Sequence, residues 1–196
     1  VWSPDPDPFL PLHYDARDLT PKRRLKSLLL TRLRLAPDPD APLIGVVSRL
    51  VTQKGVDLLT AALPELLSST RASFALLGNG DAPFAAALRR VADSNRERVS
   101  CFEGYDERLA HEIFAGSDLT IVPSRYGPCG LTQMYALGFG TVPVRRAGMP
   151  GLQPAGMGQR LLAQAASQQA PHDPQLWNSY GNLLSGLDDQ GGANRA

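Results

Sequence analysis

The sequence has few cysteines, no long apolar run and no excess of charge of either sign. Its two cysteines, Cys101 and Cys129, lack the spacing of a redox or metal motif, so we expect reduced thiols and no metal site. The absence of about 18 consecutive apolar residues argues against a membrane-spanning helix. Twenty basic and 19 acidic residues give a net charge of +1. We therefore expect neither a nucleic-acid-binding nor a membrane-binding face.

A targeting signal is also not visible, and the first residue is Val1 rather than Met. We therefore expect a fragment or a processed chain. A length of 196 residues suits one domain with extensions, and 43% hydrophobic residues can supply its core.

Residues 1–40 are predicted to form a lead-in arm followed by a basic helix. The Pro-Asp repeats before residue 9 exclude a regular helix and favour an extended arm. A helix is predicted from Asp18 to Leu35, with Asp18 or Thr20 as its N-cap. Its expected apolar stripe consists of Leu25, Leu28, Leu29 and Leu33. Its expected basic face consists of Lys22, Arg23, Arg24 and Lys26.

Residues 41–148 alternate between short apolar runs and amphipathic segments. Strands are predicted at residues 43–48, 74–77, 98–102, 119–122 and 141–144. Helices are predicted at residues 55–67, 83–92, 107–116 and 131–139. This alternation indicates an α/β fold with a doubly wound, parallel, Rossmann-like sheet.

The ends of these strands carry the candidate site, because parallel sheets bind ligands at their carboxyl edge. Arg49 and Lys54 follow the first strand, and two cations beside a glycine can hold a diphosphate. The later strand ends contribute Gly78 and Gly80, then Tyr105, then the segment 123–132. Taken singly, these features are more often a solvated surface pair of cations, a turn and a packing aromatic. Their occurrence at successive strand ends favours a nucleotide site.

Three motifs resemble the C-terminal domain of bacterial glycogen synthases and plant starch synthases. They are residues 45–57, residues 77–81 and, most diagnostic, residues 123–133, read with the strand at 140–146. The resemblance covers residues 1–148. It implies the C-terminal half of a GT-B fold, with ADP-glucose as donor and no cofactor or metal. It also implies transfer of glucose, with retention, to the non-reducing end of an α-1,4-glucan.

The resemblance also implies roles for individual residues. Arg49 and Lys54 would neutralise the diphosphate leaving group, and Tyr105 would lie against the adenine. The expected donor-binding residues are Gly78, Gly80, Tyr105, Cys129, Gly130, Leu131 and Thr132. The partners implied are ADP-glucose, an α-glucan and an N-terminal GT-B domain that this chain lacks. The compartment would be the cytoplasm in a bacterium and the plastid in a plant or alga.

The sequence departs from the family pattern in places that bear on activity. Gly127 stands where the family has a glutamate that contacts the transferred glucose. Residues 149–196 match nothing in the family and are expected to form an atypical loop, a helical segment and a disordered end. Two main hypotheses follow: the donor-binding domain of a glycogen or starch synthase, or a catalytically degenerate nucleotide- or glucan-binding module. The motif at residues 128–132 argues against a third, a different nucleotide-sugar transferase. We expect the chain alone to be inactive.

Overall fold

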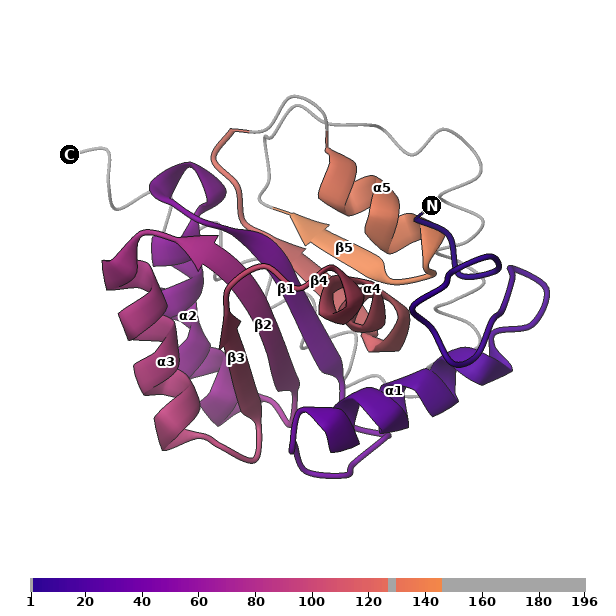
Figure 1. Ribbon diagram of the computed structural model, residues 1–196. Coiled ribbons are helices and arrows are strands. Elements are labelled where there is room, and N and C mark those ends of the chain that lie inside the picture. Colours follow the sequence, from indigo (N-terminus) through magenta and orange to yellow (C-terminus); the bar gives the residue numbers. More distant parts are fainter. Residues whose placement is uncertain (1, 127–129, 146–196) are drawn as a thin grey trace.

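The computed structural model describes residues 2–126 and 130–145 (Figure 1). They form a parallel sheet with strand order β3-β2-β1-β4-β5, which confirms the predicted α/β fold. The strands are β1 (Leu43–Leu50), β2 (Ser73–Gly80), β3 (Val99–Glu103), β4 (Leu119–Val122) and β5 (Val142–Arg145). The helices are α1 (Thr20–Arg32), α2 (Val56–Ser69), α3 (Ala82–Ser94), α4 (Glu107–Gly116) and α5 (Leu131–Gly138), with a 3-10 turn η1 (Thr52–Lys54). The predicted tail at residues 149–196 lies outside the described residues.

Both faces of the sheet are covered, because successive strand side chains point in opposite directions. In β2, Phe74 and Leu76 join a core cluster with α2 and α3. Ala75 and Leu77 join a second cluster with α1 and α4 on the other face. Figure 1 shows α2 and α3 together on one side of the sheet and α4 on the other. Burial on both faces accounts for the nearly continuous apolar runs in the sequence.

Strands β1 and β2 are longer than predicted. They pair without interruption from Leu43 with Ser73 to Leu50 with Gly80. The prediction that Gly78 and Gly80 form a loop after the strand was wrong, and both lie within β2. A Cβ atom on Gly78 would come within 2.3 Å of the Ser48 carbonyl oxygen, and one on Gly80 within 2.5 Å of the Leu50 oxygen. These glycines therefore allow the close approach of two backbones.

The N-terminal arm is not helical, as predicted, but it bends and packs against α4 and α5 rather than staying extended. The Trp2 ring stacks between His111 and Tyr135, with ring centroids 3.8 Å and 4.4 Å away. The fully buried Asp7 carboxylate lies 2.6 Å from Nδ1 of His111. The arm therefore closes the side of the core that α4 and α5 leave open.

Helix α1 differs from its prediction in three ways. Leu19 occupies the N-cap position, and the Asp18 carboxylate accepts a hydrogen bond from the Thr20 N–H. Leu28, expected in the apolar stripe, is 51% exposed. The predicted basic face is also wrong, because Lys22 and Lys26 are buried while Arg23 and Arg24 are exposed. The buried stripe contains Lys22, Leu25, Lys26, Leu29 and Leu30.

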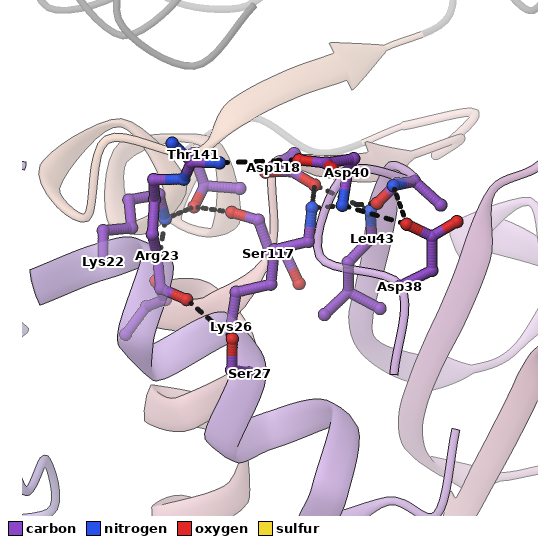
Figure 2. Close-up of polar contacts among 12 residues, drawn as sticks. Lys22, Arg23, Lys26, Ser27, Asp38, Asp40, Leu43, Ser117, Asp118 and Thr141 are labelled. Atoms are coloured by element: carbon purple, nitrogen blue, oxygen red, sulfur yellow. Dashed lines mark hydrogen bonds and ion pairs between the residues drawn. The ribbon is translucent and has the colours of Figure 1, made fainter. Parts of the chain in front are cut away.

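Lys26 forms a nearly buried ion pair with Asp118, which lies just before β4. Its Nζ donates to Oδ2 of Asp118 at 2.7 Å and to the Ala41 carbonyl at 2.8 Å (Figure 2). The same Asp118 oxygen accepts the N–H of Leu43, at the start of β1, at 2.7 Å. The pair therefore joins α1 to the amino ends of β1 and β4.

Lys22 donates hydrogen bonds to carbonyl groups in the last turn of α4. Its Nζ donates to the carbonyls of Phe114 and Ala115 and to Oγ1 of Thr141, at 3.2, 2.9 and 2.7 Å. The final carbonyls of a helix have no intrahelical partners and carry its negative dipole end. Both properties favour a lysine head group here, and Figure 2 shows it next to Thr141.

Removing the partner of Lys26 should strongly destabilise the chain. Asp118→Asn leaves a buried ammonium without a counter-charge, and we expect the free energy of unfolding to fall by about 3 kcal/mol. Urea unfolding at pH 7 measures this. The control is Asp93→Asn, which breaks the exposed Arg96–Asp93 pair and should cost less than about 0.5 kcal/mol. Equal losses in the two variants would contradict the prediction.

Lys22 should make stability depend on pH. Burial lowers its pKa from 10.5 to about 7, which Asp118 counteracts and Lys26 reinforces. Between these values the unfolded chain binds one more proton than the folded chain, so stability rises with pH.

In Lys22→Met this contribution is absent. The unfolding free energy of wild type relative to the variant should therefore increase from pH 7 to pH 9, by at most about 1.4 kcal/mol per pH unit. Urea unfolding at pH 7, 8 and 9 measures the difference. A constant or decreasing difference would show that Lys22 does not titrate in this window.

Candidate functional site

The order of the sheet reverses at β1, and this reversal places the candidate site. Strands β2 and β3 lie on one side of β1, while β4 and β5 lie on the other. Strand β1 pairs with β4 only through Ile44 with Leu119 and Gly45 with Thr120. The later residues of β1 pair with β2 alone. Open α/β sheets bind their ligands at the carboxyl ends of strands at such a switch point.

Two of the predicted site residues are cations at the carboxyl end of β1. Arg49 was expected just after the strand but lies within it, one residue before its end, and it is exposed. Lys54 lies in η1 and is half-buried. Within residues 2–126 and 130–145, neither side chain forms an ion pair with a carboxylate. Two cations without acidic partners make this strand end suitable for an anion.

A second group of donors lies where α5 begins. Gly130 caps this helix in the left-handed region, with φ of 59°. Hydrogen bonding within the helix starts with the N–H groups of Gln133 and Met134, which donate to the Gly130 carbonyl. The amides of Leu131 and Thr132 precede this first turn and have no intrahelical acceptor. Such amides are a common phosphate-binding element.

The segments that follow β1 and β4 are joined by polar contacts that the sequence did not reveal. The Arg125 N–H donates to the Gln53 carbonyl at 2.9 Å, and its Nη1 donates to the Thr52 carbonyl at 2.9 Å. The guanidinium also binds both carboxylate oxygens of Asp57 at 2.5 Å. Hydrogen bonds from Arg125 lower the pKa of Asp57, although burial opposes this shift.

Gly55 allows these two segments to meet. Its φ of 69° lies in the left-handed region, and a Cβ atom there would come within 2.0 Å of the Pro123 carbonyl oxygen. In the sequence, Gly55, Asp57 and Arg125 stand out only as parts of motifs. Their role follows only from the strand order, which makes β1 and β4 neighbours.

Three of the other predicted site residues, Gly78, Gly80 and Tyr105, are described by the structure. Gly78 and Gly80 are on β2, on the side of β1 opposite to β4. Tyr105 follows β3 and is 84% exposed. Gly127 and Cys129 lie outside the described residues. Their predicted contacts with a donor therefore stay predictions.

The described part of the chain offers neither a cluster of metal ligands nor a membrane-spanning helix. Among residues 2–126 and 130–145, no group of three or more His, Cys, Asp or Glu side chains is arranged to hold a metal ion. None of the helices in these ranges has the length and apolar character needed to cross a membrane.

Curated relatives match most of this chain. Glycogen synthases from Anaeromyxobacter dehalogenans and Aromatoleum aromaticum are each 49% identical to it over 147 residues, or 75% of its length. The chain spans only 31% and 30% of these two relatives.

A solved structure has a similar fold. The catalytic domain of starch synthase IV from Arabidopsis thaliana, bound to ADP and acarbose, is similar with a TM-score of 0.70 and 29% sequence identity. The similarity covers 95% of this chain and 42% of that one. The family model described as glycosyl transferases group 1 matches residues 41–170, more than half of the chain. The chain therefore belongs to the glycosyl transferases group 1 family, within which its relatives are glycogen and starch synthases.

Proposed function

We propose that this chain is the donor-binding half of a glycogen or starch synthase, and that its donor is ADP-glucose. The observation that carries the proposal is the pair Arg49 and Lys54, which have no acidic partner in the described ranges and lie at the switch point of the sheet. The identity of 49% with glycogen synthases supports it. So does the similar Arabidopsis structure, which is bound to ADP and acarbose.

The proposed mechanism is electrostatic. When the bond from glucose to the diphosphate breaks, negative charge builds up on the diphosphate. Cations that are already in place stabilise this charge without reorganising water, which lowers the barrier. Arg49 supplies a planar fork of donors and Lys54 a point charge. The first amides of α5, at Leu131 and Thr132, provide further donors to the phosphates.

The rest of the reaction needs groups beyond these. The glucose would pass, with retention, to the non-reducing end of an α-1,4-glucan held between this half and an N-terminal GT-B domain. Tyr105, exposed after β3, would lie against the adenine, with Gly78 and Gly80 beneath the donor. The compartment would be the cytoplasm in a bacterial host and the plastid in a plant or algal host.

A second candidate is a module that binds a nucleotide or a glucan without transferring glucose. Gly127 favours it, since this position carries a glutamate in the family pattern that the sequence resembles. Loss of one preorganised polar group at a reacting centre can cost about 10²–10³ in rate. A module that binds a nucleotide would share the diphosphate site with the first candidate and differ from it in catalysis.

Substitution of either cation should weaken nucleotide binding. Arg49→Ala and Lys54→Ala each remove charge-assisted hydrogen bonds, so we expect the Kd for ADP to rise by about 10- to 100-fold. Isothermal titration calorimetry measures this. Arg24→Ala, which removes an exposed cation of α1, is the control and should leave the Kd unchanged. Undiminished binding in both site variants would refute the phosphate role.

Transfer by the chain itself tests the binding-module candidate. We expect no measurable incorporation of radiolabelled glucose from ADP-glucose into a glucan, because Gly127 supplies no carboxylate. Gly127→Glu is the matched variant. Appreciable elongation by the wild-type chain would eliminate the binding-module candidate.

A further inference from the structure

The Arg125–Asp57 ion pair lies between the two segments that carry the proposed diphosphate ligands. Asp57 is in the first turn of α2, three residues after Lys54, and Arg125 follows β4, five residues before Gly130. Both side chains are half-buried, with exposed fractions of 36% and 30%. The pair is bidentate, so it restricts orientation as well as distance.

The sheet itself does not hold these two segments together. Pairing between β1 and β4 ends at Gly45 and Thr120, which leaves the carboxyl half of β1 without a partner on that side. The contacts that join the segments include those of Arg125 with Thr52, Gln53 and Asp57, and the packing of Gly55 on Pro123. A longer hydrogen bond, from Nε2 of Gln53 to the Tyr126 carbonyl at 3.4 Å, adds to them. The position of the Lys54 turn relative to Arg125, in the segment after β4, therefore depends on these contacts.

The pair also determines which charges face a ligand. A free Asp57 carboxylate close in sequence to Lys54 would attract that ammonium and repel a diphosphate. Both of its oxygens are instead bound by the Arg125 guanidinium. Arg125 thus neutralises the acidic group that is closest to Lys54 in the sequence and leaves Lys54 available.

We propose that Arg125 and Asp57 are positioning residues for the diphosphate site: their ion pair holds the Lys54 turn against the segment that leads to α5. Neither residue needs to touch the ligand. This inference rests on the proposed function and names the residues that preorganise its site.

The test combines ADP affinity, measured by calorimetry, with amide hydrogen exchange on the full 196-residue chain. Arg125→Ala and Asp57→Asn should each raise the Kd for ADP by about tenfold, and the double variant should lose no more than either single one. Asp57→Glu keeps the carboxylate and should recover most of the affinity. The Gly55 and Arg125 amides, which bond to Thr52 and Gln53, should exchange about tenfold faster in Asp57→Asn.

The matched control is Arg89→Ala. It breaks another arginine–carboxylate pair, with Glu103, whose exposed fractions are 62% and 37% and which joins α3 to β3. We expect it to leave both the Kd and the exchange of the Gly55 amide unchanged. The midpoint of urea unfolding should shift no more in Asp57→Asn than in this control, since both pairs lie near the surface.

The other possible outcomes distinguish failure of the inference from failure of the proposed function. A loss of affinity in Arg125→Ala but not in Asp57→Asn would show that Arg125 contacts the ligand directly and would overturn the inference. So would unchanged amide exchange in Asp57→Asn, or additive losses in the double variant. A wild-type chain that binds no ADP would overturn the proposed function together with the inference. If the wild-type chain binds ADP and the Asp57→Asn variant binds it equally well, the inference alone is overturned.

Discussion

The arrangement of the sheet depends on the ion pair between Lys26 and Asp118. The Asp118 carboxylate binds Lys26 of α1 and the N–H of Leu43. Its backbone N–H donates to the Leu43 carbonyl, and its carbonyl accepts the N–H of Val142. One residue thereby joins α1 to the amino ends of β1, β4 and β5. Since a carboxylate withdrawn from water is stable only when its partners are in place, this junction allows one arrangement of these elements.

The same junction explains where the sheet can open. Strands β1 and β4 are held together at their amino ends, where only two pairs of residues face each other in the ladder. Beyond Gly45, β1 is bonded on one side, and the contacts of Arg125 with the turn after β1 replace the missing backbone hydrogen bonds. An ion pair therefore lies at each end of the contact between β1 and β4. The nearly buried Lys26–Asp118 pair is at the amino ends, and the half-exposed Arg125–Asp57 pair is at the carboxyl ends. The proposed ligand site lies at the half-exposed end.

Basic residues serve different purposes at the two edges of the sheet. At the amino edge, Lys22 satisfies the carbonyls at the end of α4 and Lys26 is paired with Asp118. At the carboxyl edge, Arg125 is committed to Asp57, while Arg49 and Lys54 have no carboxylate partner in the described part of the chain. This division concentrates unpaired positive charge where helix N-termini also point. An anion bound there would interact favourably with both cations and with the amides at the helix N-termini.

The sequence by itself determined the fold class, the succession of strands and helices, the family and the identity of Arg49 and Lys54 as candidate ligands. These follow from periodicity and from motifs, which are local. It could not predict that Gly78 and Gly80 extend β2, that Lys22 and Lys26 are buried, or that Arg125 binds Asp57. Each of these depends on a neighbour far along the chain: the β1 backbone, Asp118 with the end of α4, and a carboxylate 68 residues away. Only the tertiary structure decided them, because a polar side chain is buried or paired according to what the fold brings next to it.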